Sequence, residues 1–597
     1  MTKDIYSKIW DLDVFYKGGS DSKEFLEHLF QTGEHIKQFS NKVQMYQPFN
    51  GKNDQSFVLE LIKLYERIVK KVRQAGAFVS CLEAQNIKDK QANTLRGKVM
   101  ELSASFQNAL TIFDGKISAY DDEQWNKLLQ GEGLTELIFV LTERRMQAKN
   151  KLGEEEEMLI NKLSIDGYHG WSQMYDTIVS SIQIPLEENN QTYYLSVGQA
   201  ANKFSDSDRN VRKAVFSAWE KAWEDKSALI AKTLNHLSGF RLNVYEKRGW
   251  HNILKEPLEM NRMREKTLQT MWKVISSNKE PFKRFLERKA KLLGVEKLNW
   301  YDLDAPIGNA LGKMNYQEGA AFILKQFSLF GEEMKAFAQK AFTDRWIEAE
   351  DRKGKRPGGF HTYFPESGQS RIFMTYSGTT SNVSTLAHEL GHGFHTYAMR
   401  DIHTLNRNYA MNVAETASTF AETIVSDAAV KAASNKQEKI VLLEGKIQNS
   451  IALLMNIHAR FLFETNFYEE RKKGIVSEVK LNEIMVQAQK EAYGDALNTY
   501  HPTFWASKLH FYITGVPFYN FPYTFGYLFS LGIYVQAQKD GIGYEKKYMA
   551  LLKDTASMTV EELAKKHLAV NLAEEVFWQN AIQLCIDDVE EFLELTK

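Results

Sequence analysis

Hydrophobic residues recur with helical spacing over most of this chain. Between Phe57 and Ala104, leucine, valine and isoleucine return every three or four positions among lysines and glutamates, as in LELIKLYERIVKKVRQAG. This spacing predicts a helical hairpin or bundle. Only 10 prolines occur in 597 residues, and long stretches contain neither proline nor glycine. The pattern therefore predicts a mainly α-helical fold.

The helical pattern is interrupted between Ser181 and Val197, SIQIPLEENNQTYYLSV. Two short runs of β-prone residues flank a polar loop there, which predicts a β-hairpin. We place a boundary near this hairpin, between an N-terminal helical region, residues 1–190, and a second region, residues 191–597, which contains the candidate chemistry.

A second amphipathic helix is predicted in the middle of the chain. Its apolar stripe consists of Val383, Leu386, Leu390, Phe394 and Tyr397. This stripe leaves His388, His392 and His395 on another face. The preceding segment, SGTTSNVS, supplies the residues that cap a helix N-terminus.

His388, Glu389 and His392 form an HExxH pattern on this helix. Histidines four residues apart lie on one helix face, so both imidazoles can reach one metal ion. Glu389 projects beside such an ion and can accept a proton from water. The alternative interpretation is a polar helix face with two unrelated histidines.

A catalytic zinc site needs a third protein ligand. One known extension of the motif requires a glycine at position 395 and a histidine at position 398, where this chain has His395 and Ala398. The segment NVAETASTFAET offers Glu415, 23 positions after His392 (415 − 392), and Glu422, two helical turns further on. We assign Glu415 to the metal and Glu422 to orienting a ligand. The alternative for Glu422 is a surface charge.

These residues resemble the oligoendopeptidase F branch of the thimet oligopeptidase family. The resemblance is carried by HELGH at 388–392, VAE at 413–415, STFAE at 418–422, HFY at 510–512 and PFYNFPYTFGY at 517–527. It implies a mainly α, zincin-type peptidase with a deep substrate channel and a small β-sheet beside the metal helix. It also implies one zinc ion bound by His388, His392 and Glu415, and cleavage of internal bonds in oligopeptides.

The aromatic segment from His510 to Tyr534 has two interpretations. One is an aromatic core cluster. The other follows from the resemblance, which implies that His510, Tyr519 and Tyr523 line the cleft and stabilise the oxyanion of the transition state. Tyr519 and Tyr523, four residues apart, fit the family's tyrosine pair better than Tyr527 does.

The segment before the HExxH helix combines a predicted loop with a predicted strand. Asp351–Gly368 is rich in glycine, proline and basic residues, which predicts a loop. RIFMTY, Arg371–Tyr376, has strand composition, and we expect its Phe373–Tyr376 part to pair with an extended substrate. Gly358-Gly359 allows either close backbone approach to the substrate or a plain turn. His361 and His395 are not assigned to the site.

Composition narrows the class of protein. The formal net charge of −1 gives no indication of a nucleic-acid partner. Cys81 and Cys585 are far apart, which argues against a disulfide framework. The N-terminus lacks the pattern of a signal peptide, and no apolar run approaches the length of a membrane span. We therefore expect a cytoplasmic protein without a membrane partner.

Three alternatives to a zinc endopeptidase remain at this point. An exopeptidase of the same fold would need contacts to a terminal charge, for which the sequence shows no motif. A peptide-binding protein without catalysis would not need the complete motif with its later glutamate. A helical scaffold protein with a chance HExxH pattern would bind no metal. Histidine and carboxylate ligands also accept cobalt or manganese.

Overall fold

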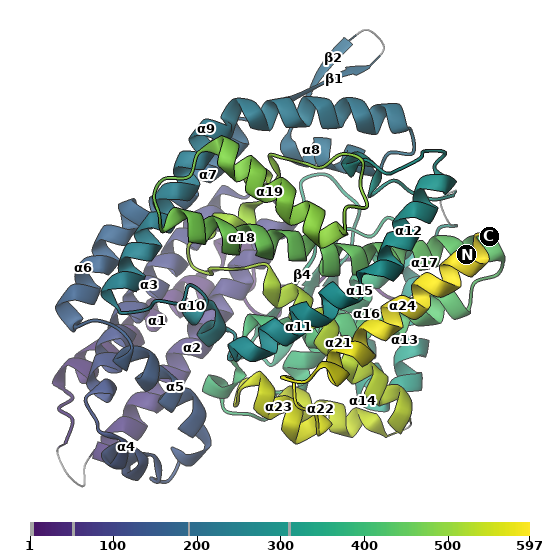
Figure 1. The fold of residues 1–597 in the computed structure, drawn as a ribbon. Coiled ribbons are helices and arrows are strands. Elements are labelled where there is room, and N and C mark those ends of the chain that lie inside the picture. The colour runs from purple at the N-terminus through teal and green to yellow at the C-terminus, as the bar shows by residue number, and fades with distance from the viewer. Residues whose placement is uncertain (1–4, 50–53, 189–190, 309–311, 542) are drawn as a thin grey trace.

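Helices dominate the computed structural model, which describes residues 5–49, 54–188, 191–308, 312–541 and 543–597 (Figure 1). Before the first strand the helices are α1 (Lys23–Met45), α2 (Asp54–Gln85), α3 (Lys90–Ser118), α4 (Asp122–Leu129), α5 (Ile138–Lys149), α6 (Glu154–Ser164) and α7 (Gly170–Ser180). The next group is α8 (Val197–Asn202), α9 (Arg209–Lys247), α10 (Lys255–Met260), α11 (Glu265–Ser277), α12 (Lys279–Leu292), α13 (Tyr316–Phe330) and α14 (Glu332–Thr343).

The remaining helices follow the central sheet. They are α15 (Thr380–Ala398), α16 (Met411–Lys431), α17 (Lys436–Ile451), α18 (Ile457–Arg471), α19 (Glu478–Tyr493), α20 (Phe504–Ser507), α21 (Phe521–Asp540), α22 (Tyr544–Asp554), α23 (Val560–Leu568) and α24 (Glu575–Leu595). The mainly α-helical fold that the sequence predicts is therefore confirmed.

The predicted helical and β-hairpins both occur. α2 and α3 cover the stretch from Phe57 to Ala104 that has helical spacing. β1 (Ile184–Glu188) pairs antiparallel with β2 (Gln191–Leu195), with Ile184 opposite Leu195 at its base. In Figure 1 this β-hairpin projects beyond the long helix α9.

A three-stranded sheet precedes α15 in the chain. It consists of β3 (Ile347–Glu348), β4 (Phe360–Phe364) and β5 (Gln369–Phe373), with β5 in the centre. β5 runs parallel to β3 and antiparallel to β4. Two predictions were wrong here. The predicted loop Asp351–Gly368 contains strand β4, because its FHTYF run combines aromatic and β-branched residues that favour a pleated surface.

The second correction concerns the strand proposed to pair with substrate. Phe373 pairs with Phe360 of β4, so β5 has neighbours on both sides. The N–H groups of Met374 and Tyr376 donate to the carbonyl oxygens of Glu348 and Ala349, at 2.9 and 3.1 Å. These groups already have partners and cannot also bind a substrate strand.

The cores show how the sheet is held beside α15. The largest hydrophobic core includes residues of α15, α16 and α21, together with α9, α18 and α24. A smaller core joins α2 and α3 to the sheet through Phe364 and Phe373. The ring of Phe15 stacks on Phe364 with centroids 3.8 Å apart. The N-terminal helices thus support the sheet against which α15 packs. The boundary near residue 190 stays a prediction.

One helical stretch corrects the expectation about apolar runs. Among the described residues, Lys436–Arg471 is long and apolar enough, by length and composition, to cross a membrane, and 44% of its most apolar window is buried. Core helices of soluble proteins also meet this criterion. Lys446 in this stretch forms ion pairs with Asp427 of α16 and Asp588 of α24, so it packs between those helices.

Candidate metal centre and active site

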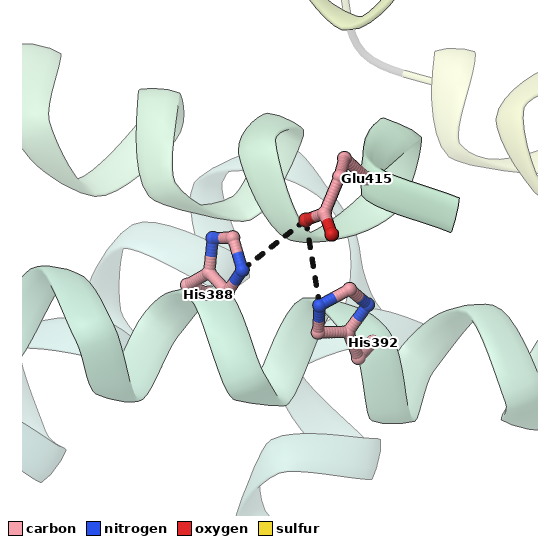
Figure 2. Close-up of side chains that lie close together, drawn as sticks. All are labelled: His388, His392 and Glu415. Carbon is pink, nitrogen blue, oxygen red and sulfur yellow. Dashed lines mark ion pairs between the residues drawn. The ribbon is translucent and has the colours of Figure 1, made fainter. Parts of the chain in front are cut away.

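The helix that contains the HExxH pattern begins at a well-formed cap. The Thr379 hydroxyl accepts a hydrogen bond from the Asn382 N–H, and the Asn382 side chain accepts one from the Thr379 N–H. This reciprocal cap satisfies N–H groups that have no partner within the helix. α15 then runs without interruption to Ala398 and presents His388 and His392 on one face (Figure 2).

Two glycines allow three helices to come close together at this face. A Cβ atom at Gly391 of α15 would lie 2.4 Å from the carbonyl oxygen of Ala417 in α16. A Cβ atom at Gly526 of α21 would lie 2.9 Å from the Asn412 carbonyl oxygen and 3.0 Å from Glu415 Cβ. Only a residue without a side chain fits at these contacts. The sequence shows both glycines but not their contacts.

His388, His392 and Glu415 come together where α15 and α16 meet. Their donor atoms all lie within 4.8 Å of one another. Oε2 of Glu415 is 3.3 Å from Nε2 of His388 and 3.5 Å from Nε2 of His392 (Figure 2). Two ligands of a tetrahedral zinc ion, with bonds of about 2.0–2.1 Å, lie about 3.3 Å apart. The two imidazoles and the carboxylate therefore fit a zinc ion in chemistry and spacing.

Hydrogen bonds from neighbouring side chains hold two of these residues, His388 and Glu415. Nδ1 of His388 lies 3.1 Å from Oε2 of Glu422. The Ser384 hydroxyl donates to Oε1 of Glu422 at 3.1 Å, and the Ser418 hydroxyl donates to Oε2 of Glu415 at 2.9 Å. Glu422 thus contacts the candidate ligand His388, as the orienting role requires. Neither serine is among the site residues predicted from the sequence, although Ser418 lies one helical turn from Glu415.

The charges of the site are strongly coupled. Burial lowers the pKa of His388, but Glu415 and Glu422 outweigh it and raise that pKa to about 10. Burial likewise raises the pKa of Glu415, yet the two histidines bring it down to about 2. Burial and the charge of His388 lower the pKa of His392 to about 4, against the influence of Glu415. Without a metal, one proton therefore resides on His388, between two carboxylates.

Glu389 is suited to accept a proton. Its side chain is 6% exposed, and its Oε2 has no hydrogen-bond partner among the described residues. Burial, with a contribution from Glu415, raises its pKa to about 7, against the opposing charge of His388. A Cβ atom at Gly359 would lie 3.1 Å from Oε1 of Glu389. Gly359 thus lies against Glu389, a neighbour that the sequence does not reveal, whereas a Cβ atom at Gly358 would have no neighbour within 4 Å.

Two further histidines lie near the site without joining its donor set. The His361 ring lies 6.4 Å from that of His392, and its Nε2 is 2.8 Å from the Ser370 hydroxyl. His395 is fully buried, 2.9 Å from the Thr555 hydroxyl. Burial lowers the pKa of each to about 3, so both are neutral.

His510, Tyr519 and Tyr523 form one cluster. Ring centroids are 5.3 Å apart for His510 and Tyr519, 6.2 Å for His510 and Tyr523, and 5.8 Å for the two tyrosines. All three are partly exposed. Tyr527 is instead buried, with its hydroxyl 2.8 Å from that of Ser450. Tyr523 lies one helical turn before Gly526, which packs against Glu415, and the charge of Glu415 acts on the Tyr523 hydroxyl.

Comparison with known proteins assigns the chain to a family. The model of the family described as "Peptidase family M3" matches residues 204–583. The chain belongs to peptidase family M3. A second model, described as "Oligopeptidase F", matches residues 116–184. The M3 family is a family of metallopeptidases, in agreement with the two-histidine, one-glutamate donor set.

Curated relatives and solved structures agree with membership of family M3. The chain is 23% identical over 567 residues to "Oligoendopeptidase F, plasmid" of Lactococcus lactis subsp. cremoris, covering 93% of this chain and 92% of the relative. It is 23% identical over 460 residues to "Oligopeptidase PepF" of Bacillus subtilis, covering 75% and 68%. The crystal structure of oligoendopeptidase-F from Enterococcus faecium superposes with a TM-score of 0.71 at 20% identity, covering 96% and 99%.

Proposed function

We propose that this M3 peptidase is a zinc endopeptidase that hydrolyses internal bonds of short oligopeptides, with the ion held by His388, His392 and Glu415. The observation that carries the proposal is the donor set, in which Oε2 of Glu415 lies 3.3 and 3.5 Å from the two imidazole nitrogens. The oligopeptide substrate class is supported by the names of the relatives. A zinc ion supplies Lewis acidity, which lowers the pKa of water towards neutrality and polarises a peptide carbonyl group.

Glu389 is proposed as the general base. Its free Oε2 can take a proton from the attacking water and return it to the departing amine. A pKa of about 7, raised by burial, lets the carboxyl group do both near neutral pH. Gly359 leaves the space beside this carboxylate open.

His510, Tyr519 and Tyr523 are proposed to stabilise the oxyanion. Burial and nearby cations lower the pKa of His510 to about 4, so its imidazole is neutral and donates one N–H. Burial raises the pKa of Tyr523, which keeps its hydroxyl protonated and able to donate. Donors fixed in position before the reaction stabilise developing negative charge more strongly than mobile water does.

Glu422 is proposed to orient His388 through Nδ1. A carboxylate at this nitrogen fixes the tautomer, so that Nε2 carries the lone pair that binds metal. We also propose a cytoplasmic location. Its support is that Cys81 and Cys585 are both free and buried, which suits a reducing compartment.

A mass-spectrometric cleavage map of a defined peptide of about ten residues, with and without a chelator, tests this function. We expect cuts at internal bonds that the chelator abolishes and added zinc restores. Stepwise loss of residues from one end would instead indicate an exopeptidase. No cleavage by protein that contains metal would indicate a peptide-binding protein.

A further inference from the structure

Arg460 is a partly buried cation with few hydrogen-bond partners. It lies on α18, and its Nη1 donates to Oδ1 of Asn520 at 3.1 Å. Its Nε is buried without a partner, and no carboxylate of the described residues lies within ion-pair distance of the guanidinium. Burial lowers the pKa of Arg460 to about 10. A guanidinium that is partly withdrawn from water and has no anion beside it is costly to the fold.

Most buried basic side chains among the described residues have the carboxylate partner that Arg460 lacks. Arg212 pairs with Asp302 at 3.1 Å, Lys289 with Glu444 at 2.6 Å and Lys355 with Glu348 at 3.1 Å. Arg371 and Arg241 have no carboxylate partner among the described residues, but each has other acceptors. Arg371 donates to the carbonyl oxygens of Asp11 and Ser370, and Arg241 donates to the hydroxyl groups of Tyr168 and Tyr468. This contrast suggests that an anion from outside the chain completes the environment of Arg460.

Lys508 is a second cation at the same place. The guanidinium carbon of Arg460 lies 5.4 Å from the ring centroid of Phe504, and Nζ of Lys508 lies 4.7 Å from it. Lys508 is partly exposed, and its ammonium group has no hydrogen bond or ion pair with the described residues. Burial and the charge of Arg460 lower its pKa to about 7, and the charge of Asp304 opposes this only in part. Two cations that form no ion pair with the described residues thus lie against one aromatic ring.

This cation pair adjoins the proposed oxyanion donors. Asn520, which accepts the hydrogen bond from Arg460, directly follows Tyr519, and Lys508 is two residues from His510. Both cations lower the pKa of His510, and the charges of Arg460 and Glu415 both act on Tyr523. A peptide whose scissile carbonyl meets these donors therefore passes close to Arg460 and Lys508.

We propose that Arg460 and Lys508 bind the free C-terminal carboxylate of the peptide substrate. This inference rests on the proposed function and adds to it how the substrate is placed. A guanidinium recognises a carboxylate through paired N–H donors, and Lys508 adds a point charge. Every unmodified short peptide carries this carboxylate whatever its sequence. The cleaved bond is consequently set by its distance from the C-terminus.

The test compares three forms of one ten-residue peptide: the free acid, the C-terminal amide, and the amide with a glutamate near its C-terminus. For the wild-type protein with zinc, we expect kcat/KM to be about tenfold or more higher for the acid than for the amide, mainly through KM. When residues are added to the N-terminus of the acid, the cut should stay at the same distance from the C-terminus.

Single substitutions test whether Arg460 and Lys508 cause the preference for the free acid over the amide. Arg460→Gln and Lys508→Met should each reduce the ratio of acid to amide towards one, and Arg460→Lys should keep part of it. Lys232→Gln removes an exposed positive charge on α9 and should leave the ratio unchanged. Melting temperatures check that each variant folds, and the wild-type comparison of acid with amide needs no variant.

The outcomes separate this proposal from the proposed function. Equal kcat/KM for acid and amide, or an unchanged preference in Arg460→Gln and Lys508→Met, would overturn the carboxylate site while leaving the endopeptidase intact. Restored cleavage of the amide by the added glutamate would overturn the C-terminal assignment in favour of an acidic side chain. Failure of the zinc-containing wild-type protein to cut any of the peptides would contradict the proposed function itself.

Discussion

Nδ1 of His388 lies 3.1 Å from Oε2 of Glu422, while Nε2 of the same ring lies 3.3 Å from Oε2 of Glu415. One imidazole thus connects two carboxylates of α16 that are seven residues apart. The two carboxylates have different proposed roles. Glu415 binds the metal together with His388, and Glu422 orients the His388 ring through its Nδ1 atom.

Glu422→Gln should weaken metal binding without unfolding the protein. The amide is the same size as the carboxylate but carries no charge to fix the His388 tautomer, so we expect about a 10- to 100-fold loss of affinity for zinc. Competition with a chromophoric chelator measures it. Glu287→Gln, at an exposed position of α12 without an ion pair among the described residues, is the control for loss of a charge. Equal zinc affinity in both variants would mean that Glu422 is a surface charge.

Zinc binding should release about one proton per ion at about pH 8.5. Glu415 and Glu422 overcome burial and raise the pKa of His388 to about 10, so this imidazole is protonated in the metal-free protein and must lose its proton to bind. His392, with a pKa lowered to about 4 by burial, is already neutral. Apparent affinity should therefore rise about tenfold per pH unit below a pH of about 10 and level off above it.

Calorimetric titrations of the metal-free protein with zinc, in buffers with different ionisation enthalpies, measure the number of protons released per ion bound. Glu422→Gln should release less than one proton at the same pH, because one of the two carboxylates that raise the pKa of His388 is gone. Binding heats that do not depend on the buffer would show that His388 is neutral before the metal arrives.

Gly391→Ala should destabilise the protein and its metal site together. The new Cβ would lie 2.4 Å from the Ala417 carbonyl oxygen, so α15 and α16 must move apart and carry the histidines away from Glu415. We expect a loss of about 1–3 kcal/mol in the free energy of unfolding, measured by denaturant titration, with weaker zinc binding.

Gly445→Ala is the matched control for this substitution. Gly445 is also helical, but a Cβ atom there has no neighbour within 4 Å. Alanine costs less conformational entropy in a helix, so this variant should be neutral or more stable by up to about 1 kcal/mol. If both variants behaved alike, the close contact at Gly391 would not matter.

The sequence predicts the parts of the site that depend on local periodicity. His388 and His392 lie one turn apart on a predicted helix, and Glu415 and Glu422 lie two turns apart on the next, so each pair shares a face whatever surrounds it. The structure brings the two helices together at Gly391, which allows the backbone of α16 to approach.

The remaining features depend on contacts between distant segments. Whether Phe373 lies at a sheet edge depends on β4, whose pairing places it next to Phe360. The contact of Gly359 with Glu389 requires the fold of the loop before β4. No carboxylate of the described residues lies within ion-pair distance of Arg460, and no motif in the sequence predicts this.

The activity and metal content of Glu389→Gln test the central claim most directly. Purified protein should contain about one zinc ion per chain, because Glu389 is not a proposed ligand, while kcat on an internal bond falls about 100- to 10,000-fold with the loss of the general base. Glu415→Ala, by contrast, should lose both metal and activity. Cleavage at the wild-type rate by zinc-loaded Glu389→Gln would contradict the account.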